Sequence, residues 1–235
     1  MDGSFVIVGN IAGKLAEFEK LVPDLLKYSP QLMLVTGNIT EDGTDESYRK
    51  SYAALSQVYK RYGVAIEVTP GSKDRYNDKL PDTYSAYFGE PTATFTALGT
   101  RFITLDSSSG VLGNKQLEFL EKNLTTNSFI FTHYPPSVGL WAFESMKEGS
   151  PRFLSILAER AHLVKGCFFG GIKTLHQEKL ASEGMMLNVP AWVVGNGGEA
   201  FEISKFGYSR PGKCGGLAVM VRSGQVSFEA ITAAE

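Results

Sequence analysis

Three short apolar segments in the first third of the chain are separated by amphipathic segments, and this alternation constrains the fold more than any other feature of the sequence. The apolar segments are SFVIVG (residues 4–9), QLMLVT (31–36) and VAIEVT (64–69). Between them, leucine and aromatic residues recur at the three- and four-residue spacing of amphipathic helices. Short apolar runs bounded by glycine and polar residues are typical of buried parallel strands. The order therefore predicts a parallel sheet with right-handed crossover connections.

The second half of the chain is richer in strands. Its predicted elements are a hairpin-like strand pair around Gly99, a helix, a buried strand, a second helix that begins near Pro151, another buried strand and a series of short strands. In chain order they cover residues 92–98 and 100–106, 116–124, 128–132, the segment from 151, 166–169, and the segments EKLAS, MMLNVPAWVV, GGLAVMV and QVSFEAIT, with a tight turn at Ser223-Gly224. We therefore expect two packed sheets flanked by helices.

The composition indicates one globular domain that is not built for nucleic acid or membranes. The 235 residues are 43% hydrophobic, which is enough for one large core. The net charge of -2 gives no electrostatic footprint for DNA or RNA. The sequence shows neither a signal-peptide pattern at its start nor a run of about 18 apolar residues. We expect a cytoplasmic protein with no nucleic-acid partner and no membrane partner.

Two cysteines, Cys167 and Cys214, lie far apart in apolar segments. Their number and spacing do not match a disulfide framework or a zinc cluster. We expect both to be reduced thiols in the core.

Five loops follow predicted strands and carry glycine or histidine. They read IVGNIAG, LVTGNITEDG, VTPGSKDRYN, FTHYPP and FFGGIKTLH. Ligands of parallel α/β sheets bind beyond the carboxyl ends of the strands, so these loops form the candidate site. Their order and spacing resemble the calcineurin-like metallophosphoesterases, which carry Asp-x-His, Gly-Asp, Gly-Asn-His-Asp or Glu, a lone His and Gly-His-x-His in these places. The segment TFTALGTRFITLDSSSG followed by QLEFLEKNL resembles the same family.

This resemblance covers most of the chain and implies both a fold and an activity. The implied fold is a four-layer α/β/β/α sandwich of two mixed sheets flanked by helices, formed as a single domain by residues 1–235. The implied activity is hydrolysis of phosphomonoesters or phosphodiesters at a pair of divalent metal ions such as Mn, Fe, Zn or Ni.

The sequence departs from the resembled family at most of the implied metal ligands. Asn10 and Ala12 stand where the first motif has its Asp and His, and Asn38 replaces the bridging Asp of the second motif. In the third motif, Ser72 replaces the metal-binding Asn, and Lys73 replaces the His that assists the leaving group. Asparagine keeps the shape of aspartate without its charge.

The remaining motif positions keep one implied ligand. Asp74 and His133 are retained, whereas Gly171 and Lys173 replace the two histidines of the last motif. Among the implied metal-ligand positions, only His133 keeps a ligand type of the family. Two metal ions need carboxylates that offset their charge, and Lys173 brings an ammonium instead. We predict a vestigial site with neither bound metals nor catalytic residues, made of Asn10, Asn38, Ser72, Lys73, Asp74 and His133.

The other polar residues near these loops have ordinary structural interpretations. His162 ends the predicted helix ERAH, where a cation favourably meets a helix C-terminus. His176 is expected on a loop surface, although it is close enough in sequence to swing into the site. Asp106 is expected to form a turn and Asp74 to accept backbone hydrogen bonds. His133 fits a buried strand-end histidine as well as it fits a ligand.

An alternative is that the site has exchanged metals for an anion. Lys73 and Lys173 lie on two loops that meet in the resembled fold, with Arg75 beside one of them and His133 between them. Fixed cations and glycine-rich N–H groups hold phosphate without a metal. The other interpretation is that both lysines point into water. The expected partner is therefore a phosphate-containing small molecule or another protein.

Three functional hypotheses follow from these observations. The first is a catalytically silent phosphoesterase-fold protein, a pseudoenzyme that acts by binding or regulation. The second is a divergent phosphohydrolase with a single-metal or metal-free site, and the third is a structural subunit of an assembly. The segment SVGLWAFESMKEG (137–149) bears on this choice, because a lid, a partner surface and core packing all fit its large aromatic residues.

Overall fold

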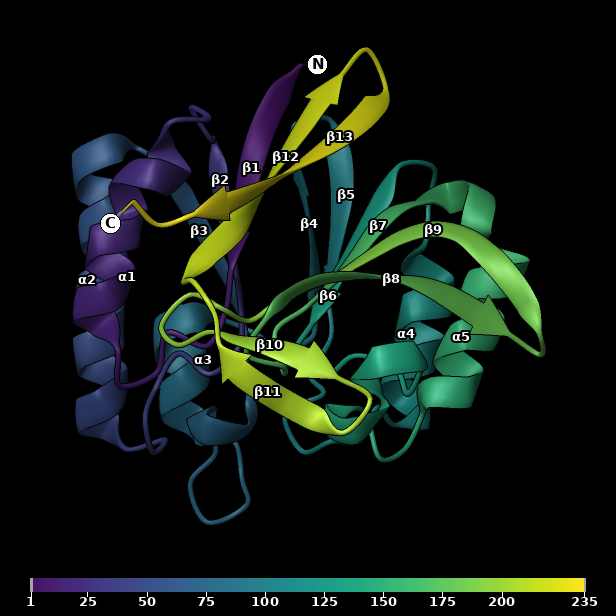
Figure 1. Ribbon diagram of the computed structural model, residues 1–235, viewed down its shortest axis with the longest axis horizontal. Coiled ribbons are helices and arrows are strands. Elements are labelled where there is room, and N and C mark those ends of the chain that lie inside the picture. The colour runs from purple at the N-terminus through teal and green to yellow at the C-terminus, as the bar shows by residue number, and fades with distance from the viewer. Residues whose placement is uncertain (1, 235) are drawn as a thin grey trace.

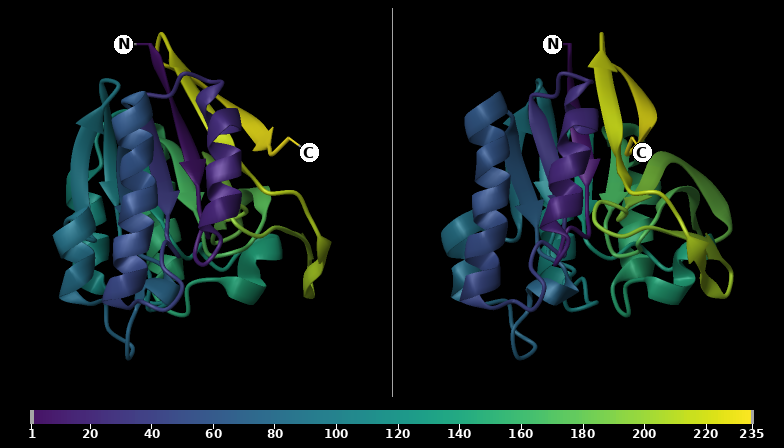
Figure 2. Two further views of the ribbon diagram at one scale, coloured as in Figure 1. Left: turned by 90° about the vertical axis from the view of Figure 1, so that its left-hand side faces the viewer. Right: turned by 60° about the vertical axis from the view of Figure 1, so that its left-hand side comes forward.

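The computed structural model describes residues 2–234 and has two large sheets packed face to face. Helices α1 (Leu15–Leu26) and α2 (Asp45–Tyr62) cover the outer face of one sheet, and α4 (Asn114–Asn123) and α5 (Ser150–Glu159) cover that of the other (Figure 1). Figure 2 shows α1 and α2 side by side on their sheet. The predicted sandwich of two mixed sheets flanked by helices is confirmed.

The first sheet has the strand order β13-β12-β1-β2-β3. β1, β2 and β3 are parallel, whereas β12 is antiparallel to both of its neighbours, β1 and β13. The turn between β12 and β13 has positive φ at Ser223 and Gly224, as the predicted tight turn requires. The strands are β1 (Gly3–Val8), β2 (Leu32–Thr36), β3 (Ala65–Thr69), β12 (Gly215–Arg222) and β13 (Gln225–Thr232).

The second sheet has the strand order β4-β5-β6-β7-β9-β8. Its central strands β5, β6, β7 and β9 are parallel, and the two edge strands β4 and β8 are antiparallel to their neighbours. The strands are β4 (Ala93–Ala97), β5 (Thr100–Thr104), β6 (Ser128–Thr132), β7 (Val164–Phe169), β8 (Leu175–Ser182) and β9 (Met185–Val194).

Phenylalanine rings fill the space between the two sheets. Phe5 of β1 contacts Phe102, Phe129 and Phe168 of the second sheet, with ring centroids 5.2, 5.0 and 6.0 Å apart in edge-to-face geometry. All four rings are fully buried. Removing one such side chain costs about 3–5 kcal/mol, so this cluster fixes how the sheets sit on each other.

A short helix and a two-stranded hairpin were not predicted from the sequence. Helix α3 (Asp82–Phe88) is only 7 residues long, and the hairpin of β10 (Phe201–Ser204) and β11 (Gly207–Pro211) has mostly exposed or half-exposed residues. Both lack the apolar periodicity that identifies longer elements. Among residues 2–234, no helix combines the length and the apolar character that a bilayer crossing requires.

Candidate functional site

The predicted site loops meet at the carboxyl ends of the parallel strands. The main-chain N–H of Asn10, after β1, donates to the carbonyl of Gly37, after β2, at 3.1 Å. The N–H of Gly170, after β7, donates to the carbonyl of His133, after β6, at 2.8 Å. The side-chain amide of Asn10 also donates to the carbonyl of Gly170, so loops from both sheets form one contiguous end of the sandwich.

The side chains of Asn10 and Asn38 form a chain of hydrogen bonds, here called the amide relay. Asn38 Oδ1 accepts from the N–H of Lys73 at 2.9 Å, and Asn38 Nδ2 donates to Asn10 Oδ1 at 2.6 Å. Asn10 Nδ2 then donates to the carbonyls of Gly170 at 2.6 Å and Gly195 at 3.1 Å. The amide relay joins loops after β1, β2, β3, β7 and β9.

The backbone at both asparagines is left-handed, with φ of 54° at Asn10 and 52° at Asn38. Asparagine tolerates this region better than most residues with a Cβ. The partners also fix which end of each amide is oxygen, because the N–H of Lys73 requires an acceptor and the carbonyl of Gly170 requires a donor. Both side chains are buried, so each hydrogen bond forms away from bulk water.

Asp74 holds the neighbouring loop in place. It ends the short 3₁₀ helix η1 (Ser72–Asp74), and its side chain is fully buried. Its carboxylate accepts hydrogen bonds from Thr40 N–H at 2.7 Å, from the Thr40 hydroxyl at 2.8 Å and from Gly71 N–H at 2.7 Å. Burial raises its pKa to about 6, although these hydrogen bonds act to lower it. The expectation that Asp74 accepts backbone hydrogen bonds is confirmed.

His133 is buried beneath the loops. Its Nδ1 lies 3.1 Å from the carbonyl of Thr36, which requires Nδ1 to carry the proton. Its Nε2 has no hydrogen-bond partner among residues 2–234. Burial lowers the pKa of this imidazole to about 4, so it is neutral at pH 7. A Cβ at Gly37 would approach Nδ1 to 2.5 Å and one at Gly71 would approach Cε1 to 2.9 Å, so both glycines are required by the ring.

The resembled family implies a metal pair at this end of the sandwich, and the residues present do not fit one. The Oδ1 atoms of Asn10 and Asn38 already accept hydrogen bonds. Ala12 and Gly171 offer no side-chain donor atom, and Lys173 offers a cation. Residues 2–234 contain no group of three or more His, Cys, Asp and Glu side chains placed to hold a metal ion.

A small cavity of about 120 Å³ opens above the amide relay. Lys73 and Lys173 both line it, so the two lysines share one cavity, and Asn10 forms part of its wall. The sequence-based prediction missed Lys14, which directly follows the loop IVGNIAG, and Glu199, which lies close to the cavity only in the folded chain. The full lining is Asn10, Ala12, Gly13, Lys14, Glu41, Lys73, Lys173 and Glu199.

The charges in this cavity are partly paired. Lys173 Nζ lies 2.6 Å from Glu199 Oε2, and both side chains are partly exposed. The hydrogen bond from Lys173 is the main cause that lowers the pKa of Glu199, and the charges of Lys14 and Lys73 lower it further. Neither Lys14 nor Lys73 forms an ion pair within the described part of the chain. Two of the three lysines that line the cavity, Lys14 and Lys73, are therefore free of ion pairs among residues 2–234.

Two predicted members of the anion site lie elsewhere. The guanidinium of Arg75 donates to the hydroxyl of Ser108 at 3.3 Å and to the carbonyl of Asp78, so it does not line the cavity. His133 lies below the cavity and does not line it. The prediction that these two residues join Lys73 and Lys173 is wrong, because hydrogen bonds direct both side chains to other partners.

The other histidines have structural positions. His176 was expected on a loop surface, but it lies in β8, half-buried, where its Nδ1 accepts from Trp141 Nε1 at 3.2 Å. That expectation is wrong because His176 pairs with Val193 of β9. His162 is exposed in the 3₁₀ helix η3 (Ala161–Leu163), just after α5 ends.

Three further expectations have clear outcomes. Asp106 forms a turn, since its Oδ1 accepts from Ser108 N–H at 2.8 Å. Trp141, in the 3₁₀ helix η2 (Gly139–Glu144), is fully buried, which supports core packing for this part of the segment 137–149. Cys167 and Cys214 are free thiols; Cys167 is buried and Cys214 is half-buried.

Larger hollows of about 370 and 430 Å³ lie away from the strand ends. The first is lined mainly by apolar and aromatic residues beside β3, and the second mainly by small and apolar residues beside α5. Apart from Val68 at the end of β3, neither contains a residue of the five loops that resemble phosphoesterase motifs. The cavity above the amide relay therefore remains the candidate site.

No protein-family profile matches the chain. A probable cyclic nucleotide phosphodiesterase of Synechococcus is 29% identical over 148 residues, covering 57% of this chain and 55% of the relative. A probable glycerophosphodiester phosphodiesterase of Arcobacter nitrofigilis is 32% identical over 127 residues, covering 47% of this chain and 44% of the relative. The chain thus spans about half the length of the curated relatives it matches.

Solved structures show the same fold over nearly the whole chain. The purple acid phosphatase PPD1 of yellow lupin has a TM-score of 0.77 at 13% identity, covering 99% of this chain and 52% of its own. A dimetal phosphatase from Danio rerio has a TM-score of 0.70 at 12% identity, covering 99% of this chain and 97% of its own. GAP50, the anchor in the inner membrane complex of Plasmodium, has a TM-score of 0.64 at 10% identity, covering 100% of this chain and 85% of its own. The resemblance drawn from the five loops is confirmed, and the chain has the calcineurin-like metallophosphoesterase fold.

Proposed function

We propose that this phosphoesterase-fold chain binds a small phosphate-bearing ligand at its former metal site and does not hydrolyse it. The observation that carries the proposal is the amide relay. In it, the side chain of Asn38 donates directly to that of Asn10, in the places where the resembled family has metal-binding carboxylates.

The absence of suitable ligands argues against catalysis. In two-metal phosphoesterases a metal-activated hydroxide lowers the barrier by several kcal/mol, and each step of about 1.4 kcal/mol corresponds to tenfold in rate. The retained His133 is neutral and lies beneath the cavity, so it is not placed to act on a ligand there. Asp74 is already engaged by Thr40 and Gly71.

The charges and size of the cavity favour a phosphate group. The free ammonium groups of Lys14 and Lys73 supply charge-assisted hydrogen bonds, which are stronger than neutral ones. A volume of about 120 Å³ suits inorganic phosphate or one terminal phosphate group, and it falls below the roughly 300–1,000 Å³ of sites for larger ligands. Because both lysines are exposed, we expect an affinity in roughly the micromolar to millimolar range.

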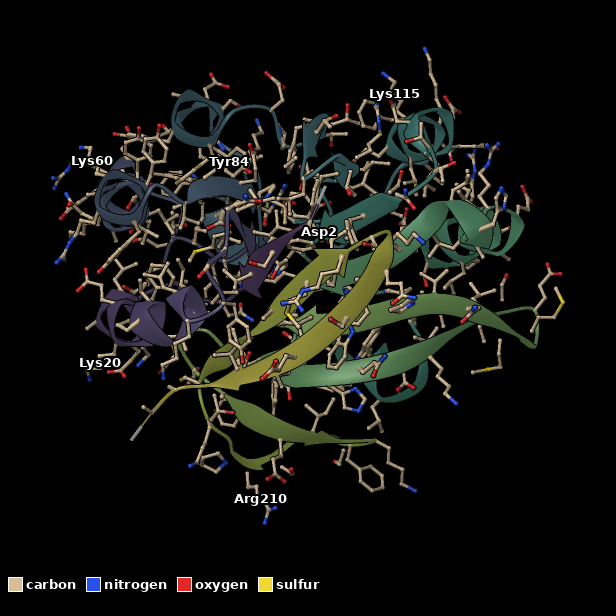
Figure 3. All side chains as sticks on the ribbon, turned by 90° about the horizontal axis from the view of Figure 1, so that it is seen from above. Asp2, Lys20, Lys60, Tyr84, Lys115 and Arg210 are labelled. Atoms are coloured by element: carbon tan, nitrogen blue, oxygen red, sulfur yellow. The ribbon has the colours of Figure 1, made fainter. Side chains whose placement is uncertain are left out.

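A thermal-shift titration with inorganic phosphate, sulfate and common nucleotides tests the proposal. A ligand that binds only the folded state raises the melting temperature by mass action. Phosphate should stabilise the wild type, and the double substitution Lys14→Ala and Lys73→Ala should abolish the response. The matched control is Lys60→Ala with Lys115→Ala, two exposed lysines on the outer helices α2 and α4, which should respond as the wild type does (Figure 3). No response in the wild type, or an equal response in both double variants, would refute the proposal.

A divergent phosphohydrolase is the second candidate. Two observations favour it: the unpartnered Nε2 of His133 is one remaining metal-ligand atom, and the curated relatives are named as probable phosphodiesterases. Turnover of p-nitrophenyl phosphate and bis-p-nitrophenyl phosphate separates the two candidates. Activity that persists through repeated purification and disappears in His133→Gln would favour the hydrolase, whereas background rates in both proteins favour the binding protein.

A further inference from the structure

The carboxylate of Glu199 interacts with all three lysines that line the cavity. Its Oε2 atom is 2.6 Å from Lys173 Nζ, and the charges of Lys14 and Lys73 act on it as well. Glu199 reaches this position from the loop between β9 and β10, which none of the phosphoesterase-like motifs includes. A resident anion therefore lies among the three lysines.

We propose that Glu199 is the residue that determines which anions enter the cavity, because it competes with them for Lys173. This inference rests on the proposed phosphate-binding function. The lining contains three lysines and two glutamates, so it attracts anions only weakly as it stands. A monoanionic carboxylate gains little by replacing a carboxylate that is already present. A phosphate dianion gains ionic interactions with Lys14 and Lys73, and it also gains Lys173 when it displaces Glu199. The cavity therefore selects phosphate over singly charged anions.

The backbone around Glu199 is held independently of its side chain. The N–H of Phe201, two residues later, donates to the carbonyl of Lys173 at 2.8 Å, and the N–H of Lys173 donates to the hydroxyl of Tyr208 at 2.9 Å. The Tyr208 hydroxyl in turn donates to the carboxylate of Glu144. The start of the β10–β11 hairpin therefore stays attached when the Lys173–Glu199 pair opens. Glu199→Gln should accordingly fold normally.

The test is calorimetric titration of the full chain with inorganic phosphate and with acetate. Glu199→Gln keeps the shape and a hydrogen-bond acceptor but removes the charge, so we expect it to bind phosphate about tenfold more tightly and to bind acetate measurably as well. The matched control is Glu202→Gln, which removes a similar ion pair, Arg210–Glu202 at 2.7 Å, from the adjacent β10–β11 hairpin outside the cavity. It should bind phosphate as the wild type does.

The outcomes distinguish this inference from the function it rests on. Phosphate binding to the wild type with unchanged affinity and selectivity in Glu199→Gln overturns the inference alone. An equal gain in phosphate affinity in Glu202→Gln also overturns it, since the gain would then follow from the removal of any negative charge nearby. No binding to either the wild type or Glu199→Gln overturns the proposed function and this inference with it.

Discussion

Asn38 donates its side-chain amide to the side-chain oxygen of Asn10 across 2.6 Å, so two residues from neighbouring strand ends satisfy each other without an ion between them. Carboxylates in both places would face each other, and the one at position 10 would also face the carbonyls of Gly170 and Gly195. Such an arrangement needs a cation to be stable. The asparagines remove that requirement.

Returning a carboxylate to the amide relay should destabilise the fold. Asn38→Asp removes the donor to Asn10 Oδ1 and buries a charge, so we expect a loss of about 2–4 kcal/mol in the free energy of unfolding at pH 7. The folded-state pKa of this new carboxyl would be raised, so the loss should shrink as pH falls toward the unfolded pKa of about 3.9. Denaturant unfolding at pH 7 and pH 4 measures this loss in the free energy of unfolding. The exposed Asn188→Asp is the control, and equal stability of the two variants would contradict the amide relay's role.

Metal analysis should find no bound pair. The residues at the positions where the resembled family has metal ligands include no carboxylate, and residues 2–234 contain no cluster of three or more His, Cys, Asp and Glu side chains placed to hold a metal ion. Protein purified without metal-affinity resin should contain far less than two equivalents of Mn, Fe, Zn and Ni together, and added Mn should leave its melting temperature unchanged. Occupancy near two ions per chain would be inconsistent with this prediction.

His133 should make the fold less stable in mild acid. Its pKa is about 4 in the folded chain, lowered by burial from an ordinary 6.5, so the unfolded chain takes up this proton first as pH falls. Neutral His133 makes its full contribution to the free energy of unfolding above pH 6.5, and this contribution is lost as the pH falls to 4. At about 1.4 kcal/mol per unit of pKa difference, the loss is roughly 3 kcal/mol.

The variant His133→Gln isolates this contribution. Asp74, whose pKa is raised to about 6, acts in the opposite direction over the same pH range, so the quantity to compare is the difference between wild type and variant. Between pH 6.5 and pH 4, the free energy of unfolding should fall with a smaller slope for His133→Gln than for the exposed His162→Gln. Identical slopes for the two variants would show that the pKa of His133 is the same in the folded and the unfolded chain, which contradicts its lowering by burial.

Salt should weaken phosphate binding. Exposed charges are screened over about 8–10 Å at physiological ionic strength, so an affinity supplied by Lys14 and Lys73 depends on salt. We expect roughly a tenfold loss between 0.05 and 0.5 M NaCl. Lys73→Ala should bind more weakly and respond less to salt. An affinity that is independent of salt would point to neutral hydrogen bonds instead of the lysines.

The sequence was informative wherever a residue's role is set by its own segment. Alternating apolar and amphipathic segments predicted the sandwich, and the order of the five loops predicted which strand ends meet. Asn10 and Asn38 could be located because each follows a strand directly. Their hydrogen bond could not be predicted, since it depends on two loops that are 28 residues apart approaching within 2.6 Å.

The sequence was less informative where a role depends on a partner from elsewhere in the chain. Glu199 carries no motif and reaches Lys173 only because β9 lies beside β7 in the second sheet. Arg75 is adjacent to the site in sequence, but its guanidinium is taken by Ser108 and Asp78. His176 was misplaced because the register of β8 against β9 is a tertiary property.

The hydrogen bonds from Asn10 to Gly170 and Gly195 also affect how the two sheets separate when the protein unfolds. Asn10 follows β1 of the first sheet, whereas the two glycines follow β7 and β9 of the second. One side-chain amide therefore links loops of both sheets by hydrogen bonds. Neither sheet separates from the other without first exposing this buried amide and the phenylalanine cluster around Phe5. The sandwich should therefore open as one cooperative unit, in which the slowest-exchanging amide protons of β1 and β7 share the free energy of global unfolding.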